Sequence, residues 1–263
     1  MRQLRWLSFA LCLLAAVASG AAEPPDGRAV LGRMKAWLEP TAPSTRRLAM
    51  TVRSAKGTVV EWKAAQARGI VDGNPFVLTV LLDPPDVRGT ALLIEQRAGQ
   101  PNAEWLYVPY LRRVRQVLPV NEFESFLNTE FTDSDVGFIN LTDRKVTLLG
   151  DGQVNGVAAY QLLEVPADPR TFTRIVTWVA KDTGQPLKRE YYDVADRLWK
   201  VETFEDVATV QGTPVAQHVR MEDVQTGYVS EYRISDVAVG VQIPGALFDW
   251  QQLAQAVDHP LWK

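Results

Sequence analysis

Apolar and polar residues alternate along most of the chain, a spacing typical of β-strands that present one face to a core. No strand–helix–strand rhythm interrupts the series, which argues against a parallel α/β fold. The pattern predicts about ten to twelve antiparallel strands in meander order, forming a strongly curved sheet or open barrel. The predicted strands are residues 48–52, 76–82, 91–96, 105–110, 114–118, 145–149, 158–165, 173–180, 187–193, 198–206, 215–224 and 228–237.

The strand at residues 76–82 is apolar on both faces. Phe76, Leu78 and Val80 share one face, and Val77 and Leu81 share the other. Such a strand is covered on both sides. Two Gly-containing pairs, at residues 151–152 and 155–156, indicate a hairpin between the strands that flank them.

Helical spacing is confined to short stretches. Val30, Met34 and Trp37 recur as one face of a helix that begins after Asp26 as N-cap and ends at Glu39, before a proline. Further helical pieces are predicted at residues 122–127, after an N-cap within Thr132-Asp133-Ser134-Asp135, and at residues 245–257.

The N-terminus reads as an export signal. Arg2 and Arg5 precede an apolar stretch from Leu7 to Val17, which is too short for a membrane span. Small residues follow, so cleavage is expected between Gly20 and Ala22. The sequence thus predicts a signal peptide at residues 1–22, a single domain at residues 23–263, and a periplasmic location.

The composition excludes several classes of functional site. The one cysteine, Cys12, lies within the signal, so the mature chain has no thiol or disulfide. Without Arg2 and Arg5, 26 basic and 31 acidic residues remain, a net charge of −5 that argues against nucleic acid as a partner. No metal-ligand, phosphate-loop or Ser-hydrolase motif is found. We therefore expect no catalytic residue, no metal and no cofactor. Asp133 and Asp135 fit a helix N-terminus better than an acid–base pair.

Large apolar side chains gather in a segment that is otherwise rich in Asn, Thr, Asp and Ser. Loop segments seldom carry so many of them unless they cover an apolar surface, so this segment is expected to form a lid over the concave side of the sheet. The residues are Phe123, Phe126, Leu127, Phe131 and Phe138.

One stretch of the chain resembles a known family. A Trp-Leu-Tyr-Val-Pro run begins at Trp105, three arginines follow, and a Ser-Phe-Leu-Asn-Thr-Glu-Phe loop begins at Ser125. This stretch resembles the signature of LolA-like outer-membrane lipoprotein-sorting proteins, although Asn128, Thr129 and Glu130 replace the family's Gly-Ser-Asp. The resemblance implies a mainly β fold: an incomplete antiparallel barrel whose concave face is covered by helices, leaving an apolar cavity for acyl chains.

The resemblance also implies where a lipid would bind. Arg112, Arg113 and Arg115 are expected either to be solvated surface charges or to contact an anionic head group or the lid. The residues expected to form the cavity and its lid are Phe76, Leu78, Val80, Trp105, Tyr107, Phe123, Phe126, Leu127, Phe131 and Phe138.

The sequence therefore favours a monomeric periplasmic carrier, without enzymatic activity, for a lipid or the acyl chains of a lipoprotein. Family members of this type suggest an inner-membrane transporter of the RND type as partner. Two alternatives remain. The protein could sense lipid or mislocalised lipoprotein for a regulatory partner, or it could be an envelope scaffold whose cavity is only a core.

Overall fold

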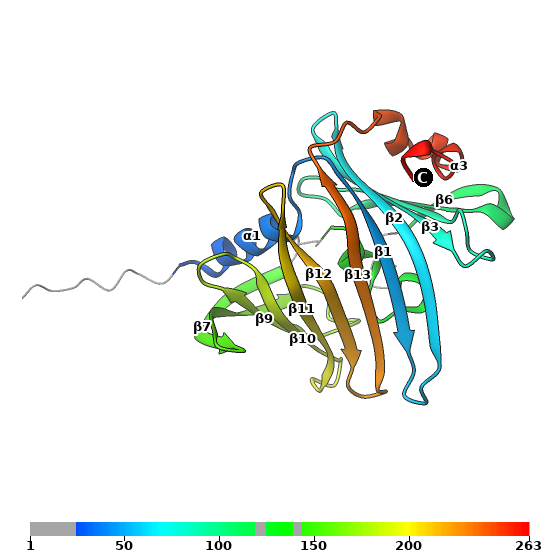
Figure 1. Cartoon of the computed structure of the whole chain (residues 1–263). Coiled ribbons are helices and arrows are strands. Elements are labelled where there is room, and N and C mark those ends of the chain that lie inside the picture. The colour runs from blue at the N-terminus through cyan, green and yellow to red at the C-terminus, as the bar shows by residue number, and fades with distance from the viewer. Residues whose placement is uncertain (1–24, 119–124, 139–143, 263) are drawn as a thin grey trace, which may run out of the picture.

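The computed structural model describes residues 25–118, 125–138 and 144–262, and a single antiparallel sheet of thirteen strands dominates it (Figure 1). The strands are β1 (Ser44–Arg53), β2 (Val59–Val71), β3 (Asn74–Asp83), β4 (Ala91–Glu95), β5 (Ala103–Val108), β6 (Arg113–Val117), β7 (Arg144–Val154), β8 (Val157–Pro166), β9 (Arg174–Ala180), β10 (Pro186–Tyr192), β11 (Leu198–Val210), β12 (Thr213–Asp223) and β13 (Tyr228–Val239).

The strand order explains the open shape of the sheet. Strands that are consecutive in the chain lie side by side from β1 to β6 and from β7 to β13, and β13 pairs with β1 to join the two runs. β6 and β7 remain as unpaired edges, so the sheet does not close into a barrel. The predicted mainly β, incomplete-barrel fold is confirmed.

Helices are short apart from the first. α1 follows Asp26 and ends before Glu39, as the sequence predicts, although the Asp26 side chain makes no capping hydrogen bond. The predicted helix at residues 245–257 is instead a series of short turns. The helical elements are α1 (Gly27–Leu38), η1 (Pro109–Leu111), η3 (Phe126–Asn128), α2 (Asp133–Val136), η4 (Gly245–Phe248), η5 (Trp250–Gln252), α3 (Leu253–Ala256) and η6 (Pro260–Trp262).

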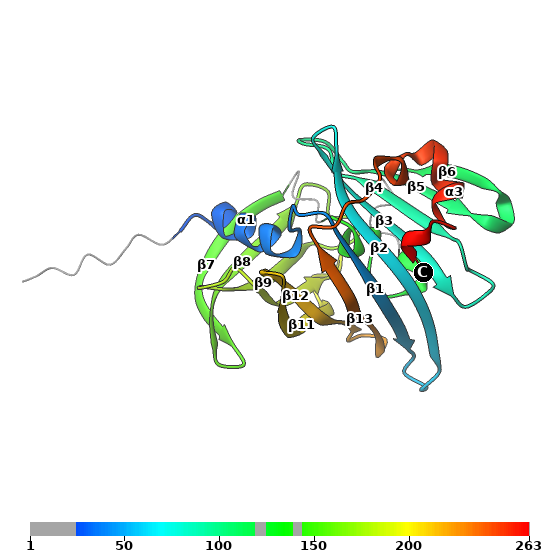
Figure 2. The same cartoon turned by 45° about the horizontal axis from the view of Figure 1, so that its top comes forward.

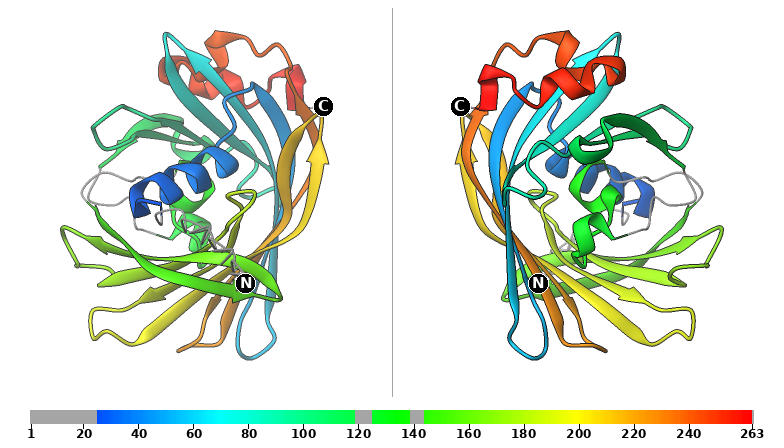
Figure 3. Two further views of the ribbon diagram at one scale, coloured as in Figure 1. Left: turned by 90° about the vertical axis from the view of Figure 1, so that its left-hand side faces the viewer. Right: turned by 90° about the vertical axis from the view of Figure 1, so that its right-hand side faces the viewer.

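The two faces of the sheet are covered by different parts of the chain. Figure 3 shows α1 and the segment containing η3 and α2 inside the curve of the sheet, with the C-terminal segment outside it. α1 packs Val30, Leu31 and Met34 on Leu162 and Val179 at the β8–β9 end. The C-terminal elements η4 and α3 lie against β2, β3, β4 and β6 (Figure 2).

Close contact on the outer face depends on a glycine in β2. A β-carbon on Gly69 would lie 2.6 Å from the Phe248 ring, so only glycine allows η4 to approach the sheet this closely. Leu253 of α3 is fully buried in the same outer cluster. Burial of one such side chain stabilises the fold by about 1.5–3 kcal/mol.

β2 is a strand that the alternation pattern did not predict. Its sequence, Val59–Val71, is rich in Ala, Lys, Gln and Arg, which favour helix rather than strand. It is nonetheless paired on both sides, with β1 and with β3. At the predicted hairpin, Asn155 and Gly156 form the turn between β7 and β8 with positive φ, whereas Gly152 lies within β7.

Three predictions lie wholly or partly outside the described residues: the signal peptide at residues 1–22, the position of Phe123, and the first half of the helix at residues 122–127. In the part of the chain that the structure describes, no helix has both the length and the apolar character needed to cross a membrane.

Candidate functional site

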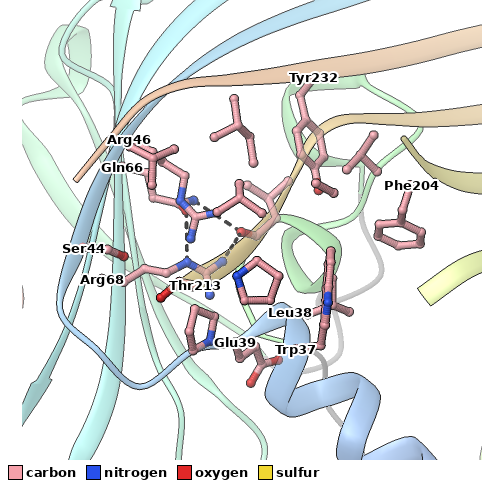
Figure 4. Close-up of a pocket in the computed structure, with 18 of the residues that line it drawn as sticks. Trp37, Leu38, Glu39, Ser44, Arg46, Gln66, Arg68, Phe204, Thr213 and Tyr232 are labelled. Atoms are coloured by element: carbon pink, nitrogen blue, oxygen red, sulfur yellow. Dashed lines mark hydrogen bonds between the residues drawn. The ribbon is translucent and has the colours of Figure 1, made fainter. Parts of the chain in front are cut away.

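A cavity lies on the concave face of the sheet, between the end of α1, strands β1, β2 and β11–β13, and α2 (Figure 4). Its empty volume is about 960 Å³, part of it open to solvent. Most of the wall is apolar, formed by Trp37, Leu38, Leu48, Val136, Phe204, Val215, Val219, Ile234 and Val237.

Residues 125–138, here called the covering segment, lie across this concave face. An isolated bridge between Ser125 and Thr132 closes its first loop. α2 then begins with a reciprocal cap, in which the Thr132 N–H donates to Asp135 Oδ2 (2.9 Å) and the Asp135 N–H donates to Thr132 Oγ1 (3.3 Å). This pairing satisfies donors at the helix start, and it confirms the predicted N-cap.

Aromatic side chains anchor the covering segment in the core. Phe126, Phe131 and Phe138 are all buried within the inner cluster of apolar residues. The Phe131 ring lies 4.9 Å from that of Tyr232 on β13. The segment is therefore packed down on the sheet rather than standing away from it.

Polar contacts from separate strands hold the backbone of the covering segment. Lys200 of β11 donates to the Glu130 carbonyl at 2.7 Å, and the Glu130 N–H donates to Ser230 Oγ of β13 at 2.8 Å. Asn102, just before β5, donates to the Phe138 carbonyl at 3.3 Å. Each of these hydrogen bonds has a modest net free energy and can break and re-form, so they add to the anchoring that the buried Phe side chains provide.

Arg68 of β2 braces the end of the covering segment. Its Nη2 donates to the carbonyls of Val136 (3.4 Å) and Gly137 (3.1 Å), and its guanidinium lies 5.6 Å from the centre of the Phe138 ring. Gln66, on the same face of β2, donates to the Val136 carbonyl at 3.3 Å. Burial lowers the pKa of Arg68, and Arg68 Nη1 is buried without a hydrogen-bond partner.

A buried ionic cluster adjoins the cavity. Arg189 donates to Glu202 Oε2 at 3.0 Å and lies 3.8 Å from Asp135 Oδ1. The Tyr191 hydroxyl lies 3.0 Å from Glu202 Oε2 and 3.3 Å from Asp135 Oδ1, and its single proton is shared between them. Burial raises the pKa of Glu202 to about 7; Arg189 opposes this rise and the Asp135 carboxylate adds to it. The cluster ties α2 to β10 and β11.

The structure separates the predicted cavity residues into two groups. Phe126, Phe131 and Phe138 belong to the covering segment, as expected. Leu127 belongs to η3, and its side chain is not among those described.

The structure places the other predicted residues elsewhere. These residues are on the outer face of the sheet, packed under the C-terminal segment, because the opposite face of each strand points into the curve. Trp105 stacks on Trp250, and the Phe76 ring lies 5.7 Å from that of Phe248. The residues on this face are Phe76, Leu78, Val80, Trp105 and Tyr107.

Among the described contacts, none joins the predicted arginine cluster to the covering segment. Arg112, Arg113 and Arg115 are exposed on or beside the edge strand β6, which agrees with the solvated alternative. In the described part of the chain, Arg68 bonds the backbone of the covering segment and Arg189 pairs with its Asp135 side chain. Sequence reasoning missed Arg68 because β2 was not recognised as a strand. Contact of the exposed arginines with a head group stays a prediction.

The cavity offers apolar surface, hydrogen-bond donors and cationic groups. In the described residues, no set of three or more His, Cys, Asp or Glu side chains gathers as a metal site. The described part of the cavity is a covered apolar space with cationic side chains in its wall.

Comparisons with known proteins assign the chain to a family. A family model described as an uncharacterized protein matches residues 73–255. A DUF1329 family protein from Desulfovibrio piger has a TM-score of 0.78 and 26% identity, with 86% of this chain and 97% of that chain covered. The chain belongs to the family that this model describes. A search of curated proteins found no match.

Other solved structures share the architecture. A putative outer membrane lipoprotein-sorting protein domain from Vibrio parahaemolyticus has a TM-score of 0.79 and 26% identity, covering 87% of this chain and 98% of that one. A LolA superfamily protein from Nitrosomonas europaea has a TM-score of 0.68 and 20% identity, covering 86% and 98%. The latter likeness shows the fold alone.

Proposed function

We propose that this protein is a periplasmic carrier that holds a lipid, or the acyl chains of a lipoprotein, in the cavity under the covering segment. One observation carries the proposal: an apolar cavity is roofed by a segment that breakable hydrogen bonds tether to several strands. The likeness to an outer membrane lipoprotein-sorting domain supports it. In this proposal residues 1–22 are the export signal, and residues 23–263 form one lipid-binding domain.

Exposing an acyl chain to water has a large free-energy cost. An acyl chain of about 15 methylenes costs roughly 12 kcal/mol to expose to water, at about 0.8 kcal/mol for each methylene. A carrier must offset most of this cost yet still release the chain. A preformed apolar cavity meets the first demand, and roof hydrogen bonds that are individually weak serve the second.

Native mass spectrometry of the protein purified from the periplasm tests the proposal. We expect a bound fraction whose added mass disappears after extraction with organic solvent and is identified as a lipid or lipidated peptide. Protein that is empty in every preparation, and that stays empty after incubation with lipid vesicles, would instead favour the scaffold alternative.

We also propose an inner-membrane transporter of the RND type as the partner that loads or unloads the carrier. Cross-linking in intact cells followed by purification is expected to recover such a transporter with the protein. Recovery of an envelope regulatory protein in its place would favour the sensing alternative.

A further inference from the structure

Two arginines from neighbouring strands meet on the cavity wall. β1 and β2 pair so that Arg46 lies opposite Gln66 and Ser44 lies opposite Arg68. Arg46 and Arg68 are therefore diagonal neighbours on one face, a position in which β-carbons are about 7–8 Å apart or less. Both line the cavity, and Figure 4 shows their side chains on the same wall.

The carboxylates around this wall are already engaged. Glu39 bonds Lys35 at 2.5 Å and accepts from Gln96 at 3.3 Å, and its charge also acts on Arg68. Glu202 and Asp135 are engaged by Arg189 and Tyr191. Within the described residues, neither Arg46 nor Arg68 forms an ion pair with a carboxylate.

The arginine pair is left with unused donors. Arg68 is 9% exposed, and its Nη1 has no hydrogen-bond partner. Arg46 is partly exposed to the cavity and forms no hydrogen bond with any described residue. Burial and the neighbouring charge of Arg68 lower the pKa of Arg46 to about 9, so it remains cationic at neutral pH. Buried donors without an acceptor, beside a like charge, are costly and mark a site that suits an anion.

We propose that Arg46 and Arg68 bind the anionic head group of an amphiphile whose acyl chain lies along the apolar wall. This inference rests on the proposed lipid-carrying function and adds the class of ligand. The planar fork of a guanidinium matches a carboxylate or a phosphate. Leu48, two residues beyond Arg46 on the same face, begins an apolar surface that continues through Ile234 and Val219. The head group and the chain thus have adjoining sites.

Displacement of the neutral apolar probe N-phenylnaphthylamine by chain-matched competitors tests this inference. The competitors are hexadecanoate, hexadecyl phosphate and the neutral methyl ester of hexadecanoate. We expect the wild-type protein to bind at least one anionic competitor about tenfold or more tightly than the ester, as expected for a hydrogen bond to a charged group. The anion that binds more tightly then indicates the natural ligand: hexadecanoate points to a fatty acid, and hexadecyl phosphate points to a phospholipid.

Arg46→Gln is the informative variant, because no hydrogen bond or ion pair joins Arg46 to the described residues of the covering segment. It is expected to lose most of the preference for the anion while binding the ester as the wild type does. Arg53→Gln is the matched control, since Arg53 is exposed at the end of the same strand. This control is expected to keep the full preference.

The outcomes separate the inference from the proposed function. Equal binding of anions and ester by the wild type overturns the head-group site but leaves a lipid-carrying cavity. An unchanged preference in Arg46→Gln overturns the role of Arg46. Failure of the probe and of every competitor to bind overturns both proposals.

Discussion

Replacing Arg189 with Leu is expected to destabilise the protein by about 3–5 kcal/mol, because it leaves buried carboxylates without their cation. Glu202 and Asp135 would keep only the Tyr191 hydroxyl as a shared donor from this cluster. For a chain of this size, each kcal/mol shifts Tm by roughly 2–4 °C. Thermal and urea unfolding at neutral pH measure the loss.

Matched variants isolate the charge effect. Lys188→Met changes the neighbouring residue on β10, whose pair with Glu190 lies nearer the surface, so it is expected to cost no more than about 1 kcal/mol. The double variant Arg189→Leu/Glu202→Leu is expected to recover part of the loss, since it removes one stranded carboxylate. A loss in Arg189→Leu no greater than that in Lys188→Met would show that the buried cluster is not ionic.

The same cluster predicts how stability depends on pH. Burial raises the pKa of Glu202 from 4.5 to about 7 in the folded protein. The folded state then binds the Glu202 proton more tightly than the unfolded state does. This contribution to stability is fully present below about pH 4.5 and is lost as the pH rises through about 7. The deficit of Arg189→Leu is expected to be larger at pH 8 than at pH 5, and Glu202→Gln to flatten the wild-type profile.

Replacing Arg68 with Met is expected to loosen the covering segment without unfolding the sheet. The variant loses the donors to the Val136 and Gly137 carbonyls. Hydrogen bonds to charged groups contribute about 1.5–3 kcal/mol, so local opening is expected to become roughly 10- to 100-fold more frequent. Hydrogen exchange of peptides from residues 125–138 measures the opening.

Lys63→Met is the control for this loosening, because Lys63 is exposed on the same strand. It is expected to leave exchange in the covering segment unchanged. If residues 125–138 exchange hydrogen at the same rate in Arg68→Met as in Lys63→Met, Arg68 does not brace the segment.

Elements with strong local signals could be predicted from the sequence. The α1 boundaries follow from helical spacing, from Asp26 as a residue suited to the N-cap, and from Pro40 just after the last turn. The Thr132 cap and the Asn155-Gly156 turn follow from side chains that act on their own backbone. The antiparallel order follows from alternation along successive strands.

The cavity wall could not be predicted in the same way. β2 has a helix-favouring composition, so Gln66 and Arg68 gave no strand signal, and their partners are 68–70 residues away in the sequence. β3 is apolar on both faces, so alternation separates Phe76 from Val77 but does not say which face is concave. That choice depends on the C-terminal segment, which covers the Phe76 face.

Filling the cavity tests most directly whether it is the lipid site. Val237 of β13 is partly buried and lines the cavity, so Val237→Trp places a ring in the open space with little strain on the core. Ser235→Trp adds the same ring at an exposed position of the same strand. Titration with N-phenylnaphthylamine is expected to show at least about tenfold weaker binding in Val237→Trp, and wild-type binding in Ser235→Trp. Binding of the probe by folded Val237→Trp with wild-type affinity would contradict a lipid site in this cavity.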